Sequence, residues 1–206
     1  MQKDNSFYHI VKRVFDVVTS FIGLIVLFVP LAIVALIIYI ECPAVSPIYI
    51  QKRVGKNGRE FCFMKFRTMI PDADKMLDEL LAKNEMDGPV FKIENDPRIT
   101  KFGRFLRKTG LDELPQLINV ICGDMSLVGP RPPLPREVLQ YDERHKQRLT
   151  VMPGITCYWQ IQPKRNTLSF EQWIELDLKY IEERSLMTDI KILCKTVCAV
   201  IGMEGV

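Results

Sequence analysis

An uncharged apolar stretch over residues 17–40 is the feature that most limits how this chain can fold. As an α-helix it would be about 36 Å long, which is enough to cross the hydrocarbon core of a bilayer. The rest of the 206-residue chain has an ordinary soluble composition, and the net charge is only +3. These observations exclude a polytopic membrane protein, which needs several such stretches, and they also exclude a disordered chain.

The flanks and the middle of this stretch favour a helix that enters the membrane and returns to the same side. Positive charges occur at both ends, with Lys12 and Arg13 before the stretch and Lys52 and Arg53 after it. They therefore do not indicate which end of a spanning helix would face the cytosol. Pro30 removes a helical hydrogen bond in the middle and bends the axis. A re-entrant helix satisfies both observations, while a single span and a buried helix of a soluble fold stay open as alternatives.

The cysteine and histidine content narrows the possible chemistry. The six cysteines include no CxxC pair, so we expect free thiols in a reducing cytosol. Only two histidines occur, His9 and His145, and they lie far apart in the sequence. A histidine-based triad or zinc site is therefore not expected, and a carboxylate is the expected acid, base or nucleophile, with Mg²⁺ as a suitable metal.

The remaining chain predicts an α+β fold that is mostly helical. The Asn57-Gly58 turn signal predicts a small β-hairpin over 47–69. Helices are expected over 72–85, 98–108, 111–122, 136–149, 170–183 and 186–201, and 153–166 is expected to be irregular. The amphipathic, cationic 98–108 helix suits a membrane surface, although an ordinary surface helix explains it equally well. We predict a membrane-associated segment over 1–45 and a cytosolic domain over 46–206.

The most informative stretch for chemistry is 109–119, TGLDELPQLIN. Pro115 is tolerated only in a first helical turn, so the helix should begin near Asp112. Asp112 and Glu113 would then lie at a helix N-terminus, where free N–H groups favour a phosphate. Adjacent carboxylates point about 100° apart on a helix, so one could attack a substrate while the other holds a metal. Alternatively, Asp112 is a helix cap and Glu113 a favourable first-turn charge.

Four cations are candidates for binding phosphate near these carboxylates. Lys65 and Arg67 end the second half of the predicted hairpin, and Arg107 comes one turn before the acidic pair. Arg131 stands between two prolines, which restrict its backbone, and an arginine can hold phosphate with a bidentate fork. Together with the apolar stretch, this set predicts phosphoryl chemistry on a lipid-linked substrate. Each cation taken singly could also be a solvated surface charge.

Several ordered motifs lead to a family resemblance that covers nearly the whole chain. They are KRVFD before the apolar stretch, KFRTM, the run from DGPVF to VGPRP, PGIT, and the closing DLKYIEERSLMTDIKILCKT. On these motifs the chain resembles the bacterial sugar transferases, also called monotopic phosphoglycosyl transferases. The middle motifs are similar to those of the initiating hexose-1-phosphate transferases of exopolysaccharide, capsule and O-antigen pathways.

The resemblance implies transfer of a sugar 1-phosphate from a UDP-sugar to polyprenyl (undecaprenyl) phosphate, with release of UMP. It implies a re-entrant helix in a phospholipid membrane, the bacterial inner membrane, with the catalytic domain over 46–206 facing the cytosol. The resemblance does not imply nucleic acid as a partner. The sugar, the polyprenol length, the pathway and the oligomeric state stay open.

The resemblance also implies roles for individual residues. Asp112 matches the nucleophile that takes the phosphosugar as an acyl phosphate, and Glu113 matches the carboxylate that holds Mg²⁺. Arg107 and Arg131 match positions suited to clamping phosphate groups.

Further matching positions concern the membrane helix. Lys12, Arg13 and Asp16 are expected at the mouth of the hairpin, near the lipid headgroups. The family often has Ser-Pro at the bend, whereas Val29 precedes Pro30 here. The serine's share in breaking the helix is therefore missing.

A second departure leaves other functions open. The family tends to read PGITGLWQVSGR where this chain reads PGITCYWQIQPKRN, so Cys157 replaces a usual glycine. That region is expected near the nucleotide or the sugar. A catalytically dead membrane adaptor and a different interfacial phosphotransferase are the alternatives, and the intact Asp112-Glu113 pair disfavours the first.

Overall fold

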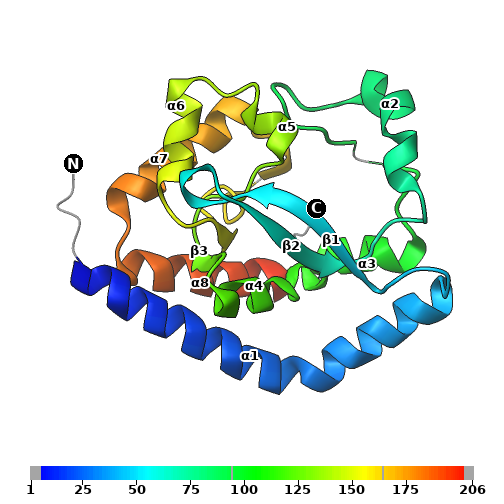
Figure 1. Ribbon diagram of the computed structural model, residues 1–206, viewed down its shortest axis with the longest axis horizontal. Helices are drawn as coiled ribbons and strands as arrows, with labels where there is room; N and C mark the ends of the chain where they lie inside the picture. The colour runs from blue at the N-terminus through cyan, green and yellow to red at the C-terminus, as the bar shows by residue number, and fades with distance from the viewer. Residues whose placement is uncertain (1–5, 94, 164, 202–206) are drawn as a thin grey trace.

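The computed structural model describes residues 6–93, 95–163 and 165–201. Figure 1 shows one long helix, α1 (Ser6–Glu41), along one side of a body that holds the other elements. In chain order these are β1 (Ile48–Val54), β2 (Glu60–Phe66), α2 (Leu77–Leu80), α3 (Lys101–Thr109), α4 (Gln116–Cys122), β3 (Ser126–Val128), α5 (Pro135–Val138), α6 (Glu143–Lys146), β4 (Gly154–Thr156), α7 (Phe170–Glu183) and α8 (Leu186–Ile201). The predicted fold, mostly helical with a small β-hairpin, is confirmed.

The hairpin formed by β1 and β2 crosses the centre of the body (Figure 1). The strands are antiparallel, with Ile48 opposite Phe66 and Val54 opposite Glu60. The connecting turn contains Asn57 and Gly58 at φ values of 57° and 79°, which are left-handed conformations that these two residue types adopt readily. The turn signal in the sequence therefore marks the hairpin correctly.

A second, two-stranded sheet was not predicted. β3 and β4 are parallel, with Ser126 opposite Gly154 and Val128 opposite Thr156. Each strand has only three residues, which is too short for a period of two to be visible in the sequence. A Cβ at position 154 would lie 2.0 Å from the backbone nitrogen of Gly129, so only glycine permits this close approach.

The main core lies where the hairpin, α4, β3, α7 and α8 meet. Its side chains are aromatic and aliphatic, as expected for a close-packed interior. They are Phe61, Phe63, Leu117, Val120, Met125, Leu127, Val128, Tyr180 and Ile192. This core joins the hairpin β1–β2 to the two C-terminal helices, α7 and α8.

Both arms of α1 pack against the same body, and the helix bends between them (Figure 1). In the first arm, Phe15 and Leu24 contact the main core beside Leu117. In the second arm, Ile38 is buried against Leu106 of α3. Because a proline inside a helix removes one backbone hydrogen bond, Pro30 gives the physical cause of the bend.

The middle of α1 is apolar and exposed. Val26, Phe28 and Val29 are 69%, 70% and 63% exposed, immediately before Pro30. α1 is also long and apolar enough to cross a membrane. An exposed apolar stretch of this size is costly in water, which indicates that lipid or another apolar partner covers it.

Two of the predicted helices are instead short pieces. Residues 72–85 form two 3₁₀ turns around the four-residue α2, because Leu80 is buried there while Leu81 is 51% exposed. A helix of that length needs a packed apolar face, and this segment has too little of one. Residues 136–149 are divided between α5, α6 and a 3₁₀ turn, since Asp142 caps a new helix by accepting from the His145 N–H.

The predicted helix over 111–122 also begins later than expected. Gly110, at φ 70°, ends α3, and Asp112 and Glu113 lie in a 3₁₀ turn (Leu111–Glu113). α4 begins only at Gln116, directly after Pro115. Because proline lacks the N–H that a continuing helix needs, the acidic pair is separated from α4 rather than forming its first turn.

A close backbone contact between α3 and the end of the hairpin generates a stability prediction. A Cβ at Gly103 would lie 2.1 Å from the Thr68 carbonyl oxygen, so Gly103→Ala should force α3 outward. We expect a loss of about 2–3 kcal/mol and a fall in Tm of roughly 5–10 °C in detergent, measured by differential scanning fluorimetry. Gly23→Ala is the matched control, because its Cβ would meet Leu117 at an ordinary 3.5 Å. Equal Tm values for the two variants would contradict the contact.

Candidate functional site

A cleft of about 780 Å³ lies between the hairpin and the C-terminal part of the body. It is lined by residues of β1 and β2, of the turn Leu111–Glu113, of the start of α5, and of α7 and α8. All six residues predicted to bind or react with substrate line this one cleft: Lys65, Arg67, Arg107, Asp112, Glu113 and Arg131. The fold therefore brings together residues that are scattered over 66 positions of sequence.

Asp112 is the most deeply placed carboxylate of this set. Its side chain is only 8% exposed, and burial together with the adjacent Glu113 raises its pKa to about 6. Three cations, Lys65, Arg107 and Arg131, act in the opposite direction and favour the ionised form. At neutral pH Asp112 is thus mostly a carboxylate that is poorly solvated, as a nucleophile requires.

Glu113 is paired with Arg131 across the cleft. Arg131 Nη1 donates to Glu113 Oε1 at 2.9 Å, and the two side chains are 34% and 22% exposed. The pair is accessible to a ligand, because neither partner is fully buried. A phosphate group entering the cleft could therefore share the Arg131 guanidinium with Glu113.

Lys65 and Arg67 both lie over the ring of Tyr49 on the neighbouring strand. Lys65 Nζ and the Arg67 guanidinium carbon are each 5.4 Å from the ring centroid. Burial and the nearby Arg107 and Arg53 lower the pKa of Lys65 to about 7. Arg67 is also fixed by its Nε, which donates to the Ser46 carbonyl at 2.8 Å.

Arg107 reaches the cleft from the last turn of α3. Its Nε donates to Thr68 Oγ1 at 3.0 Å, and burial lowers its pKa while the Asp112 carboxylate opposes that shift. The close backbone approach at Gly103 is what brings α3 and Thr68 together. The arginine is therefore positioned by the packing of the helix that carries it.

Arg53 is a site residue that the sequence analysis missed as a phosphate-binding candidate. It lines the cleft, is 8% exposed, and stands over the Phe63 ring with its guanidinium carbon 5.2 Å from the centroid. Tyr49, Gln51 and Arg53 all line the cleft, as alternate residues of one strand should. Because side chains alternate between the two faces of a strand, the predicted hairpin could have placed Arg53 on the same face as Tyr49 and Gln51.

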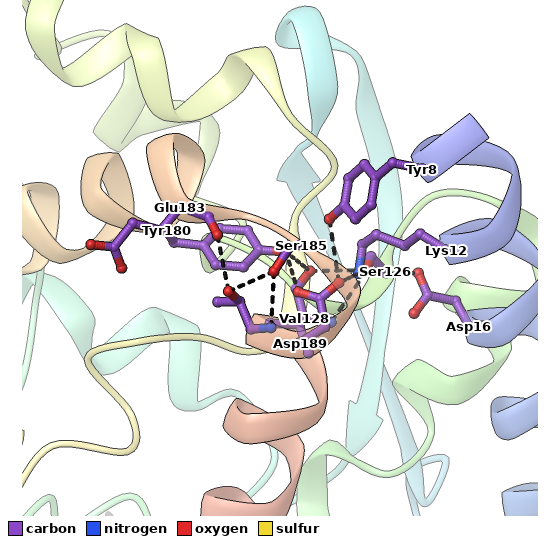
Figure 2. Close-up of polar contacts among 10 residues, drawn as sticks. Tyr8, Lys12, Asp16, Ser126, Val128, Tyr180, Glu183, Ser185 and Asp189 are labelled. Carbon is purple, nitrogen blue, oxygen red and sulfur yellow. Dashed lines mark hydrogen bonds and ion pairs between the residues drawn. The ribbon is translucent and has the colours of Figure 1, made fainter. Parts of the chain in front are cut away.

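The residues predicted at the mouth of the membrane helix point into the protein. Figure 2 shows Lys12 and Asp16 extending from α1 toward Asp189 of α8. Lys12 Nζ lies 2.8 Å from Asp189 Oδ2 and 3.6 Å from Asp16 Oδ2. Tyr180 completes the contact by donating to Asp189 Oδ1 at 2.8 Å. These side chains hold the first arm of α1 against the body.

Arg13 also holds the first arm of α1 against the body, by binding the end of α4. Its Nη1 and Nη2 atoms donate to the carbonyls of Val120 and Ile121 at 2.5 and 2.9 Å. The last carbonyls of a helix lack intrahelical partners, so a cation is favourable there. Pro30 lies in the middle of α1, outside the cleft.

The donor set fits Mg²⁺ bound together with a phosphorylated ligand. Asp112 and Glu113 are adjacent carboxylates in the cleft, and Glu113 Oε2 is not used in its bond to Arg131. Among the described residues, no group of three or more His, Cys, Asp and Glu side chains gathers to enclose a metal. This suits Mg²⁺, which is usually held by one or two carboxylates plus substrate phosphates and water.

Comparison with known proteins gives the family. The profile of the bacterial sugar transferases matches residues 7–203. The chain belongs to this family. It is 45% identical over 196 residues to the galactosyl transferase CpsE of Streptococcus agalactiae, covering 95% of this chain and 43% of that protein. It is 40% identical over 198 residues to the exopolysaccharide production protein ExoY of Rhizobium meliloti, covering 94% of this chain and 87% of that protein.

A third relative carries a more specific name. The UDP-glucose:undecaprenyl-phosphate glucose-1-phosphate transferase of Escherichia coli is 39% identical over 200 residues, which is 91% of this chain and 39% of that protein. The chain thus spans less than half the length of several relatives that it matches, although it spans most of ExoY. The family match over residues 7–203 contains the cleft and α1 except for its first residue.

The lowered pKa of Lys65 can be tested without any assumption about substrate. Because the amine is already mostly neutral above pH 7, its rate of acetylation by trace acetic anhydride should level off above about pH 8. Peptide mass spectrometry would follow Lys65, with the 75% exposed Lys52 as the internal control for reagent. Inorganic pyrophosphate should protect Lys65 and not Lys52. A Lys65 rate that keeps rising beyond pH 9 would contradict the lowered pKa.

Proposed function

We propose that this protein transfers a sugar 1-phosphate from a UDP-sugar to undecaprenyl phosphate, or a similar polyprenyl phosphate, and releases UMP. The observation that carries the proposal is the buried Asp112 beside the Glu113–Arg131 pair in a cleft lined by cations. The name of the E. coli relative, which gives a UDP-glucose donor and an undecaprenyl-phosphate acceptor, and that of the R. meliloti relative, which gives exopolysaccharide production, support it. An acceptor that carries no sugar places the reaction at the first sugar-transfer step of exopolysaccharide or related glycoconjugate synthesis.

The first displacement begins at Asp112. Its carboxylate oxygen attacks the phosphorus that carries the sugar, the bond from that phosphorus to the bridging oxygen breaks, and UMP leaves with the bond's electrons. The product is an aspartyl-phosphosugar. Lys65, Arg107 and Arg131 surround the carboxylate and offset the charge of the incoming diphosphate.

The second displacement returns the enzyme to its starting state. A phosphate oxygen of the polyprenyl phosphate attacks the same phosphorus, and the bond to Asp112 breaks to regenerate the carboxylate. Two steps let UMP leave before the lipid phosphate enters, so one set of cations serves two anionic substrates in turn.

Glu113 is the residue we expect to hold Mg²⁺. A bound Mg²⁺ would offset negative charge on the diphosphate while the anionic Asp112 approaches it. Arg131, which donates to Glu113 at 2.9 Å, would bind the phosphate groups beside that carboxylate. Glu113 therefore orients Arg131 in the free enzyme and is available to the metal when substrate binds.

The shape of α1 supports a re-entrant membrane helix. Both arms of the helix pack on one body, and the exposed apolar residues before Pro30 lie at the bend between them. The second end is tied as well, since Thr100 Oγ1 donates to Glu41 Oε2 at 2.9 Å. We infer that the bend dips into the cytoplasmic membrane while the catalytic body stays on the cytosolic side, with Phe105 of α3, 47% exposed, at the lipid surface.

The assignment of Asp112 is tested by substitution. In membranes supplied with radiolabelled UDP-sugar, undecaprenyl phosphate and Mg²⁺, Asp112→Asn should reduce formation of the lipid-linked product by at least about a thousandfold, because an amide is a poor nucleophile. Asp124→Asn is the matched control and should retain activity, and EDTA should abolish it in the parent. Equal product formation by Asp112→Asn and the parent would refute the nucleophile.

The topology is tested independently of activity. Single cysteines placed at His9 and Lys56 of a cysteine-free variant should react with an impermeant maleimide only from the cytosolic side. His9 lies in the first arm of α1 and Lys56 lies in the hairpin that follows its second arm. If α1 is re-entrant, both positions should therefore lie on the same side of the membrane. Labelling of the two positions from opposite sides would establish a single span instead.

A further inference from the structure

The segment that carries Arg131 has few hydrogen-bond donors of its own. Residues 129–133 read GPRPP, and the three prolines have no backbone N–H. The segment must therefore be held mainly through its carbonyl groups, which need donors from elsewhere.

The carbonyls on both sides of Arg131 have such donors. The Pro130 carbonyl accepts from the Gly154 N–H at 3.0 Å, and the Pro133 carbonyl accepts from the Val54 N–H at 2.9 Å. The Pro132 carbonyl accepts from Arg53 Nη1 at 3.0 Å. Strands β4 and β1 thus fix the segment on both sides of Arg131, and the Arg131 carbonyl needs a donor as well.

Arg148 supplies the donor to the Arg131 carbonyl. Its Nη2 lies 3.2 Å from that oxygen and 2.5 Å from Asp177 Oδ2, and its Nη1 donates to the Tyr141 hydroxyl at 2.9 Å. The Arg148 and Asp177 side chains are 4% and 0% exposed. One buried guanidinium therefore connects a carboxylate, a hydroxyl and the backbone of the cleft arginine.

These contacts form a continuous path to the reaction site. Asp177 of α7 holds Arg148, Arg148 holds the Arg131 carbonyl, and Arg131 Nη1 bonds Glu113 at 2.9 Å. Among the residues that the structure describes, neither Arg148 nor Asp177 lines the cleft. Their hydrogen-bonded connection to the cleft runs through Arg131.

A role in stability alone does not explain this arrangement well. Burying two charges is costly, and apolar side chains of similar size are often as stable or more stable. Among the residues that the structure describes, Asp177 Oδ1 and Arg148 Nε are also buried and have no hydrogen-bond partner, which adds to the desolvation cost of the pair. What an apolar pair could not provide is a directed donor for the Arg131 carbonyl.

We propose that Arg148 and Asp177 are positioning residues that set the direction of the Arg131 side chain for binding the donor's phosphate groups. This inference rests on the proposed function. It predicts that losing the pair mimics a partial loss of Arg131, because a misdirected guanidinium no longer meets the phosphates where charge develops.

The test uses the double variant Arg148→Met/Asp177→Leu in the full chain. Both charges leave together, so no unpaired buried charge remains and the protein should stay folded. The kcat/KM for the UDP-sugar should fall at least about tenfold. Arg148→Lys keeps a positive charge opposite Asp177 but lacks the fork, so it should give a smaller loss and serves if the double variant fails to fold. Arg144→Met, on the exposed α6, is the matched control and should be unchanged.

A second readout separates positioning from a general structural effect. The substitutions are repeated in an Arg131→Ala background, where no guanidinium is left to direct. We expect them to cause less than a twofold further loss there, which is a strong departure from additivity. Losses that multiply in the Arg131→Ala background would overturn the inference, and so would a double variant within twofold of the parent. An inactive parent with every UDP-sugar would instead refute the proposed function.

Discussion

Two adjacent carboxylates, one buried and one partly exposed, lie in a single turn, and the elements around that turn are arranged to accommodate them. Asp112 is 8% exposed and Glu113 stands beside it, and such a pair is unfavourable unless cations surround it. No single element could supply those cations. β2 provides Lys65, the last turn of α3 provides Arg107, and the proline-rich segment after β3 provides Arg131. The fold can be understood as the arrangement that brings these three elements to one turn.

The second constraint is the position of that cleft relative to lipid. α1 is held at its first arm by the Lys12–Asp189 ion pair and at its end by the Glu41–Thr100 hydrogen bond. The exposed apolar bend lies between these two attachments. Under the proposed function, this arrangement would let a water-soluble nucleotide sugar and a lipid phosphate meet the same carboxylate, because the body that holds the cleft also holds both arms of α1.

Much of this could be predicted from the sequence wherever a local rule applied. The Asn57-Gly58 turn marked the hairpin, and Pro115 indicated a helix that begins near Asp112, although α4 begins four residues later, at Gln116. What local rules could not show were long-range partners. Lys12 meets Asp189 across 177 positions, and Arg148 meets Asp177 across 29. Arg53 was missed as a phosphate-binding candidate because its role depends on which face of β1 meets the cleft.

The proposed mechanism requires Asp112 to carry the phosphosugar between donor and acceptor. Intact-protein and peptide mass spectrometry can detect this intermediate in enzyme that is mixed with its UDP-sugar and Mg²⁺ in the absence of lipid phosphate. We expect a mass gain of one sugar phosphate on the peptide that contains Asp112, and this gain should disappear when undecaprenyl phosphate is added. A fully active enzyme that shows no such adduct, or that carries it on a different residue, would refute the covalent role of Asp112.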